Sequence, residues 1–287
     1  MGKFVKKYFL NGAAGRRCFI GFMLLSACNT DELRRLQVDQ SFEGEEIYLI
    51  SNVLDEHLLL AFHSYEKYRD TLFTATLADC PVVNIIENED VDENDRKVHL
   101  DYILPNCEGA PATRRGRIVL TFGKSPSTEK DSVKISYEGY SVNGVEITGS
   151  RMLNLLANGR NRQLFSDMAE DIIIENDVGS SSRVSFAFEH ELAIKDRILT
   201  ESVSTGNLSG RNWTGKTISM DISQPKHMVK TCWDQKKFRP VAGEERWTVE
   251  RTEVPDVVHR LVYSSDEGCE TRSIIFLSEG VQMEKRP

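Results

Sequence analysis

The sequence has no hydrophobic run near its N-terminus that is long enough to form a membrane-spanning helix. Residues 18–25, CFIGFMLL, are apolar, but a helix that crosses a bilayer needs about 20 such residues. The first 17 residues also lack acidic side chains, although they contain several lysines and arginines. Basic residues followed by a short apolar segment are typical of a secretory signal. We therefore predict an exported chain, with a buried N-terminal helix or strand as the alternative.

Small residues end the apolar segment, and a cysteine follows them. The tetrad Leu25-Ser26-Ala27-Cys28 resembles the lipobox of bacterial lipoproteins. The resemblance implies that residues 1–27 are a lipoprotein signal peptide and that Cys28 carries acyl chains such as palmitate. Because two or more acyl chains hold a protein stably at a membrane, we expect a lipid-anchored protein that does not span the bilayer.

The residues after Cys28 bear on the destination of the protein. Asn29 differs from the aspartate that retains enterobacterial lipoproteins in the inner membrane. Asp31-Glu32 resembles the acidic export signal of surface lipoproteins in Bacteroidota. We expect a protein of the outer membrane, with the cell surface favoured over the periplasmic face.

Positive charge is scarce in the mature chain. The whole sequence has 36 Lys and Arg against 44 Asp and Glu. Removal of residues 1–27 leaves 31 cationic residues against 44 acidic ones, which is a formal charge of −13. This excess disfavours nucleic acid and anionic membrane surfaces as partners, because both repel an acidic protein.

Close cysteine pairs of the C-x-x-C type are absent, which disfavours a zinc site built from thiolates. Outside the signal there are four cysteines: Cys80, Cys107, Cys232 and Cys269. An even number in an exported chain predicts disulfide bonds, with three possible connectivities. The sequential pairing, Cys80–Cys107 and Cys232–Cys269, closes the shortest loops and is favoured.

Polarity divides the mature chain into three regions. Residues 28–44 are polar and acidic, which predicts a flexible tether. Residues 45–70 carry apolar side chains three and four apart, which predicts one amphipathic helix. The apolar stripe of this helix comprises Ile47, Ile50, Leu54, Leu58, Ala61, Phe62 and Tyr65. Residues 71–287 form the expected β-rich domain.

A helical pattern is nearly absent after residue 80, where MLNLLANG at 152–159 is the one candidate. Short β-branched and aromatic runs recur instead between Gly, Asn and Asp. Val184, Phe186 and Phe188 alternate with smaller residues, so one face of that strand should be packed. Asn143-Gly144 predicts a type I′ hairpin turn. We expect an all-β fold with one N-terminal helix: a mostly antiparallel meander, curled sheet, sandwich or half-barrel.

Motifs for catalysis and for phosphate or metal binding are incomplete. His190-Glu191 begins like a zinc-protease motif, but Ile194 stands at the second ligand position. Residues 179–183 lack the second glycine of a nucleophile elbow, and residues 123–125 lack the leading glycine of a phosphate loop. Residues 89–97 lack the glycine of a calcium loop, so a solvated hairpin is favoured over weak calcium binding. We predict no enzyme activity, metal or cofactor.

Aromatic side chains and two short triplets are further candidates. Trp213, Trp233 and Trp247 could form a glycan platform, but core packing is favoured for each of them. Asp70-Thr71-Leu72 and Asp131-Ser132-Val133 resemble the O-glycosylation triplet of exported Bacteroidota proteins. If they are modified, Thr71 and Ser132 should lie on exposed turns.

Short motifs around cysteines and glycines follow one another between residues 80 and 275. They are Cys80-Pro81, KVHLDY (97–102), Asn106-Cys107, GRIVLTF (116–122), GYSVNGVEITGSR (139–151), SGRNWTG (209–215), Thr231-Cys232-Trp233, FRPVAGE (238–244) and Glu267-Gly268-Cys269. In this order they resemble an uncharacterised family of exported Bacteroidota lipoproteins with β-rich domains. The resemblance implies an exported β-rich domain and supports the sequential disulfide pairing, but it implies no activity.

These observations favour a non-catalytic lipoprotein of the cell envelope, acting as a binding or envelope-assembly module whose partner is a glycan or an envelope protein. The alternative is a carboxylate-dependent hydrolase that acts on an extracellular polysaccharide. Such an enzyme needs two acidic side chains about 5–10 Å apart across a cleft, and a sequence alone cannot establish that distance. A purely structural role is the third hypothesis.

Overall fold

The computed structural model describes residues 29–77, 79–86, 96–103, 112–124, 131–196, 198–252, 255–266 and 268–285. The predicted signal peptide, Cys28, Cys107 and most of the calcium-like loop lie outside these residues. The chain divides into a small unit, residues 1–42, and a large unit, residues 43–287. All the strands belong to the large unit.

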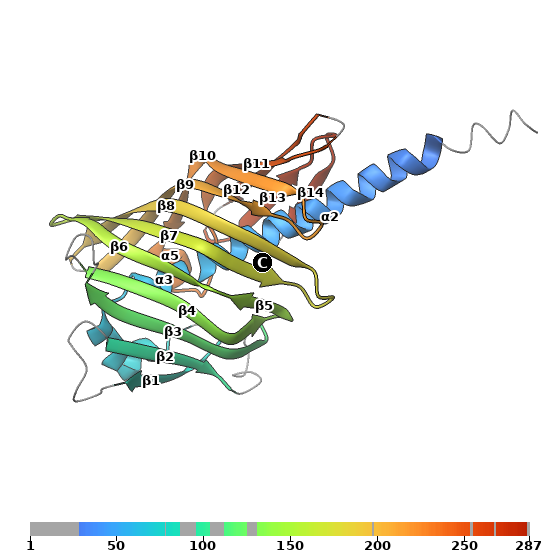
Figure 1. Cartoon of the computed structure of the whole chain (residues 1–287). Coiled ribbons are helices and arrows are strands. Elements are labelled where there is room, and N and C mark those ends of the chain that lie inside the picture. Colours follow the sequence, from blue (N-terminus) through green and yellow to red (C-terminus); the bar gives the residue numbers. More distant parts are fainter. Residues whose placement is uncertain are drawn as a thin grey trace, which may run out of the picture. The chain divides into compact units, whose positions relative to one another are not determined.

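One antiparallel sheet of 14 strands makes up most of the large unit. Strands that are neighbours in sequence pair with each other, except that β5 and β6 both lie between β4 and β7 (Figure 1). The strands are β1 (Val82–Ile86), β2 (Arg96–Tyr102), β3 (Arg114–Lys124), β4 (Asp131–Val142), β5 (Val145–Thr148), β6 (Ser150–Asn158), β7 (Arg162–Glu175), β8 (Ser181–Lys195), β9 (Ile198–Arg211), β10 (Thr217–Val229), β11 (Ala242–Val249), β12 (Val257–Ser265), β13 (Thr271–Phe276) and β14 (Gln282–Lys285). The all-β prediction is confirmed, and the single sheet rules out a two-sheet sandwich among the described residues.

The alternation of large apolar side chains with smaller or polar ones along each strand determines which face of the sheet is buried. In β8, Val184, Phe186 and Phe188 are buried and Ala187 between them is exposed. Side chains of successive strand residues point to opposite faces, and the period-2 pattern of the sequence therefore confirms the packed face. The core cluster contains these side chains together with buried residues of β2 through β13 and of the N-terminal helices.

Glycine and asparagine shape the β4–β5–β6 region. Asn143 (φ 51°) and Gly144 (φ 83°) both have the positive φ of a type I′ turn, which confirms the predicted hairpin. Gly149 (φ 106°) lies at the bend between β5 and β6, where an added Cβ would stand 2.3 Å from the Asp171 carbonyl oxygen. Only glycine fits this close approach.

The helices differ from the prediction at both ends. They are α2 (Asn29–Glu56), α3 (Leu58–Ala61), the 3₁₀ helix η1 (Tyr65–Arg69), α4 (Thr71–Thr74) and α5 (Lys230–Trp233). The predicted flexible tether at 28–44 is wrong, because α2 begins at Asn29; its leucines, arginines and glutamate are good helix formers. The predicted single helix at 45–70 is interrupted, since Ser64 is extended before η1. No helix in the described part of the chain has the length and apolar character needed to span a membrane.

The segment MLNLLANG, considered above as a helix, is strand β6. Met152 pairs with Met168 and Leu155 pairs with Phe165 of β7, and Leu153 is completely buried. The long neighbouring strands β4 and β7 offer backbone partners on both sides, so tertiary pairing overrides the local helix propensity. The correction leaves α5 as the only helix that the structure describes beyond residue 80.

The sheet curls around the part of α2 that belongs to the large unit. Glu43 contacts His259 of β12, and Glu56 contacts Arg114 of β3. A flat sheet from β3 to β12 would extend about 40 Å at the usual strand spacing, but this helical stretch is only about 20 Å long. The sheet must therefore bend around the helix, which is the curled form among the predicted alternatives.

Candidate functional site

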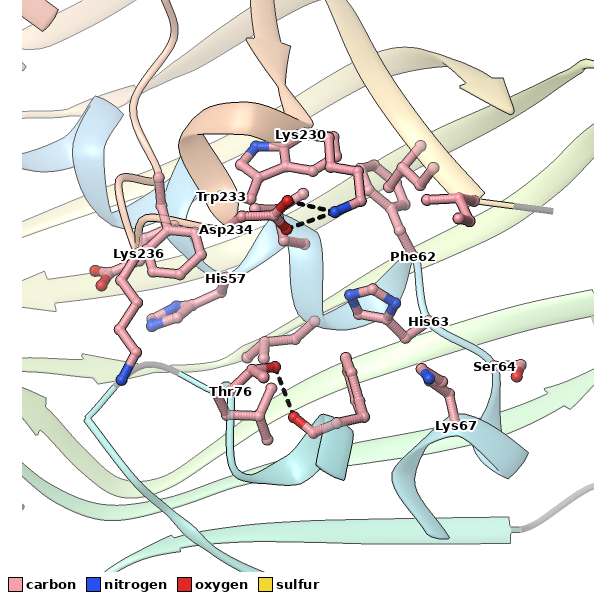
Figure 2. Close-up of a pocket in the computed structure, with 18 of the residues that line it drawn as sticks. His57, Phe62, His63, Ser64, Lys67, Thr76, Lys230, Trp233, Asp234 and Lys236 are labelled. Atoms are coloured by element: carbon pink, nitrogen blue, oxygen red, sulfur yellow. Dashed lines mark hydrogen bonds and ion pairs between the residues drawn. The ribbon is translucent and has the colours of Figure 1, made fainter. Parts of the chain in front are cut away.

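A cavity of about 940 Å³ lies within the large unit. Its lining comes from α3 and the residues after it, from the segment around α4, from the β8–β9 hairpin, and from α5 with the turn that follows (Figure 2). Small-molecule sites in proteins occupy roughly 300–1,000 Å³. The cavity is therefore large enough for a ligand.

Thirteen of the 24 residues that line the cavity are apolar or aromatic. Leu59, Leu77 and Leu192 are buried in its lining. The other apolar and aromatic lining residues are Leu60, Phe62, Phe73, Ala75, Tyr102, Ile194, Ile198, Leu199, Trp233 and Phe238. Binding an apolar group here would remove its surface and that of the walls from water, which stabilises a complex by roughly 25 cal/mol per Å².

A disulfide holds one wall of the cavity. Cys232 of α5 is bonded to Cys269, with their Cα atoms 5.2 Å apart, so this predicted pairing is confirmed. Cys80 is also disulfide-bonded, but Cys107 lies outside the described residues. Trp233 adjoins the disulfide and lines the cavity, whereas core packing was predicted for it.

The other two tryptophans have structural roles. Trp247 is completely buried, as predicted, and its Nε1–H donates to Glu245 at 2.9 Å. Trp213 is half-buried, and its backbone N–H donates to Glu46 at 2.6 Å. Among the three tryptophans, Trp233 alone lines the cavity. The sequence named Trp233 as a candidate but favoured core packing, because a helix as short as α5 shows no periodic pattern from which an outward-facing side chain could be predicted.

Lysines surround the exposed side of the cavity. Lys67 binds Asp70 at 2.9 Å, and Lys230 binds Asp234 at 2.6 Å. Lys236 lies in the turn after α5, on the far side of the cavity from Lys67 (Figure 2). Lys67 and Lys230 are thus each paired with a carboxylate, and Lys236 adds a further cation to the rim, although the chain as a whole is acidic.

The inner end of the cavity is polar and tightly bonded. The Arg114 guanidinium donates to Glu56, Asp79 and Tyr140. Both ring nitrogens of His57 lie 3.1 Å from tyrosine hydroxyls, those of Tyr137 and Tyr140. Burial, followed by the nearby Arg114 charge, holds the pKa of His57 well below its usual value. His57 is therefore neutral at physiological pH.

His63 lines the cavity between Lys67 and Phe73. Its ring meets the Phe73 ring edge-on, with the centroids 4.6 Å apart. Burial, and then the charge of Lys67, lowers the pKa of His63 to about 4. Its imidazole is therefore uncharged at neutral pH and leaves the positive charge of the rim to the lysines.

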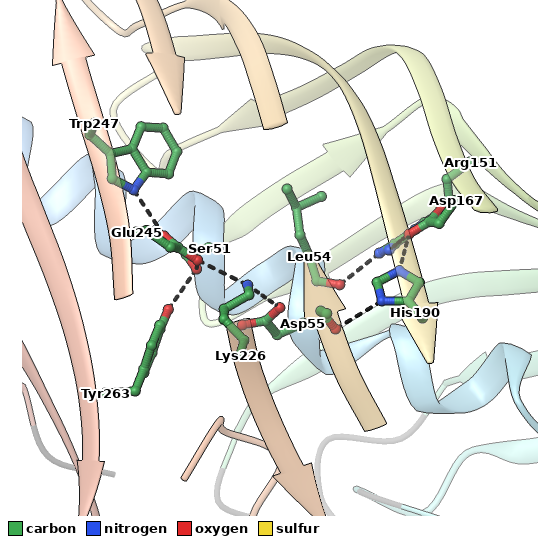
Figure 3. A network of polar contacts seen from close by, with 11 residues as sticks. Ser51, Leu54, Asp55, Arg151, Asp167, His190, Lys226, Glu245, Trp247 and Tyr263 are labelled. Carbon is green, nitrogen blue, oxygen red and sulfur yellow. Dashed lines mark hydrogen bonds and ion pairs between the residues drawn. The ribbon is translucent and has the colours of Figure 1, made fainter. Parts of the chain in front are cut away.

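His190, Asp167 and a serine of β9 form a bonded chain (Figure 3), and the His190 ring contacts Phe62 of the cavity lining. His190 Nδ1 lies 2.8 Å from Ser204 Oγ, and His190 Nε2 lies 3.1 Å from Asp167 Oδ2. The order resembles that of a nucleophile, a base and an orienting acid. All three side chains are buried, however, and none of them lines the cavity. Asp167 also accepts from Arg151, so we interpret the chain as structural.

A second buried cluster joins α2 to the sheet (Figure 3). Lys226 of β10 lies 2.5 Å from Asp55 of α2 and 2.9 Å from Glu245 of β11. Ser51 of α2 donates to Glu245 at 2.6 Å. Burial lowers the pKa of Lys226, but the two carboxylates outweigh burial and raise it above its usual value. The lysine therefore stays charged and paired with both carboxylates.

The remaining candidate residues lie apart from the cavity. Thr71 is exposed in the first turn of α4, where Asp70 caps the helix by accepting from Leu72 N–H at 2.9 Å. Ser132 is buried in β4, unlike the exposed turn expected for a glycosylated residue. His190 lies on a strand, as predicted, and no group of three or more His, Cys, Asp or Glu in the described residues could hold a metal ion.

We compared the chain with protein-family models, curated proteins and solved structures. No match was found. What the protein does must therefore be argued from the cavity and its surroundings.

Proposed function

We propose that the protein is a non-catalytic binding module of the cell envelope that takes an apolar small molecule into the cavity. The observation that carries this proposal is a cavity of about 940 Å³ in which thirteen of the 24 lining residues are apolar or aromatic. Its walls come from segments far apart in sequence, and the Cys232–Cys269 disulfide holds one of them. Such a largely pre-formed site loses little conformational freedom on binding.

The proposed address is the outer membrane, with a lipid anchor on Cys28 and with the cell surface favoured over the periplasmic face. The lipobox-like tetrad and the basic, then apolar, segment before it support this proposal. The Cys232–Cys269 disulfide supports it too, because disulfides persist in oxidising compartments outside the cytoplasm.

The cavity favours an apolar ligand over the glycan considered from the sequence. Trp247 is buried in the core, and seven of the thirteen apolar or aromatic lining residues are leucine or isoleucine, which offer no flat face on which a sugar ring could stack. A polysaccharide hydrolase gains no support, because the lining carboxylates Glu56 and Asp234 are each bound to a cation. An envelope protein remains a further proposed partner, and nucleic acid does not.

A neutral fluorescent probe tests the proposal. We expect N-phenyl-1-naphthylamine to bind the disulfide-bonded mature chain saturably, with a large rise in fluorescence. Leu199→Trp adds bulk to the lining and should abolish this binding, because the indole would occupy the cavity. The matched control is Leu164→Trp, at a half-buried strand leucine that does not line the cavity.

Circular dichroism should show that both tryptophan variants are folded. Equal binding of the probe by the native chain and by folded Leu199→Trp would contradict the cavity as the binding site. Absence of binding by the native chain would reject the proposed function.

A further inference from the structure

We infer that the ligand is an amphipath, with an apolar body in the cavity and an anionic head group among the lysines of the rim. This inference rests on the proposed function, since the apolar body has to enter the cavity. The chemistry that fits is an alkyl or acyl chain ending in a carboxylate or a phosphate.

The first argument is the sign of the charges. The lining contains the cations Lys67, Arg114, Lys230 and Lys236 but only two carboxylates, those of Glu56 and Asp234. The chain as a whole is acidic, with a formal charge of −8. Asp70 and Asp79, outside the lining, pair with Lys67 and Arg114. Lys236 is then the lining cation for which the described residues show no ion pair, and its charge complements an anion and repels a cationic amphipath.

The second argument is that the rim lysines are available. Arg114 is buried and committed to Glu56 and Asp79. Lys67 and Lys230, in contrast, have exposed side chains (47% and 37%) and pair with carboxylates that are also exposed. Exposed pairs of this kind contribute only about 0–1 kcal/mol. A ligand anion can therefore replace Asp70 or Asp234 as the partner of its lysine at little cost.

The third argument is the placement of Lys236. We find no ion pair for this lysine in the part of the chain that the structure describes. It has a φ of 59°, a left-handed conformation in which side chains other than those of Gly, Asn and Asp are uncommon. Its backbone N–H donates to the Trp233 carbonyl at 2.8 Å, and the disulfide at Cys232 anchors the same turn. The fold thus holds an exposed, unpaired lysine in a fixed turn of the cavity wall (Figure 2).

The apolar walls and the charged rim contact different parts of the ligand. The apolar body contacts the leucine and aromatic walls, which have no preference among head groups. The head group meets Lys236 in the turn after α5, and Lys67 lies on the opposite side of the cavity, away from this head group (Figure 2). The walls therefore supply affinity, and the rim supplies selectivity for negative charge.

Displacement of the neutral probe by a matched set of ligands tests this inference. The set is dodecanoate, dodecyl phosphate, dodecanol and dodecylamine, each below its aggregation limit. One charge contact at a partly solvated rim corresponds to about a tenfold change in affinity. We expect both anions to bind about tenfold more tightly than dodecanol, and dodecylamine to bind most weakly. The ratio of the two anions shows which head group the rim prefers.

Variants of the rim locate the effect. Lys236→Gln should bring the anions to within about twofold of dodecanol, and Lys236→Arg should retain their advantage, because the charge is what matters. The control is Lys134→Gln, an exposed lysine of β4 outside the lining. It should leave all four affinities unchanged.

The outcomes separate the two proposals. Equal affinity for all four ligands, with normal binding of the neutral probe, would overturn the anionic head group and leave the apolar site intact. An anion preference that persists in Lys236→Gln would overturn the assignment to this lysine. Failure of the neutral probe and of every ligand to bind would reject the proposed function, and this inference with it.

Discussion

Two buried glutamates on one helix have pKa values shifted in opposite directions by their neighbours. Glu43 and Glu46 lie one turn apart on α2, and both are buried. Although burial raises the pKa of Glu43, contacts with Arg251 at 2.7 Å and His259 at 3.2 Å outweigh burial and lower it. Glu46 accepts only neutral hydrogen bonds, from Ser182 and from the Trp213 backbone. Burial therefore raises its pKa to about 7.

We expect Glu46→Gln to change the pH dependence of stability. In the native protein Glu46 binds a proton up to about pH 7, whereas the unfolded chain releases it near 4.5. The free energy of unfolding therefore falls as the pH rises through this window, by about 3 kcal/mol in total. Glutamine keeps the hydrogen bonds at Oε1 but carries no charge, so Glu46→Gln should not lose stability as the pH rises. Urea unfolding of both proteins at pH 4.5, 6 and 8 measures this difference.

The control for this substitution is Glu45→Gln, at the neighbouring exposed residue that pairs with Lys285. In this variant the free energy of unfolding should vary with pH nearly as it does in the native protein, because an exposed ion pair contributes little to stability. If Glu46→Gln and the native protein lose the same stability as the pH rises, folding does not raise the pKa of Glu46, and the prediction is wrong.

At the scale of elements, the short helix α5 depends on its disulfide. Four helical residues are too few to be stable alone, because helix nucleation is unfavourable. The bond from Cys232 to Cys269, 37 residues further along the chain, holds α5 and the turn that carries Lys236. The disulfide therefore ties this wall of the cavity to the residues just before β13.

Replacing both cysteines by alanine, Cys232→Ala with Cys269→Ala, should lower the free energy of unfolding by about 2–4 kcal/mol. It should also weaken binding of the neutral probe, because Trp233 and Phe238 would no longer be held in the wall. Chemical unfolding and probe titration measure the two effects separately. Unchanged probe affinity in a destabilised variant would show that the wall keeps its position without the disulfide.

At the scale of the whole molecule, the proposed lipid anchor determines where the cavity works. We expect cells grown with radiolabelled fatty acid to label the native protein and the variant Cys18→Ala. Cys28→Ala should lose the label and leave the membrane fraction, because no thiol would remain at the lipobox. Label retained by Cys28→Ala would contradict the anchor, while the cavity proposal would stand on its own test.

Local features of the sequence determined much of the fold. The period-2 alternation at Val184, Phe186 and Phe188 specifies a packed strand face. Asn143-Gly144 specifies a turn, because few residues accept positive φ. The predicted disulfide between Cys232 and Cys269, which are sequential cysteines in the chain, is also confirmed. Each of these inferences needs only neighbouring residues or short loops, which is why a sequence suffices for them.

Tertiary structure alone decided the rest. It made 152–159 a strand, because β4 and β7 flank it. The cavity joins side chains from Glu56 to Phe238, and no local pattern records that they meet. The bonded Ser204–His190–Asp167 chain likewise depends on the register of three strands. The sequence by itself determined an all-β chain with a disulfide bond in its C-terminal region. The cavity exists only because the sheet curls and brings distant strands and helices together.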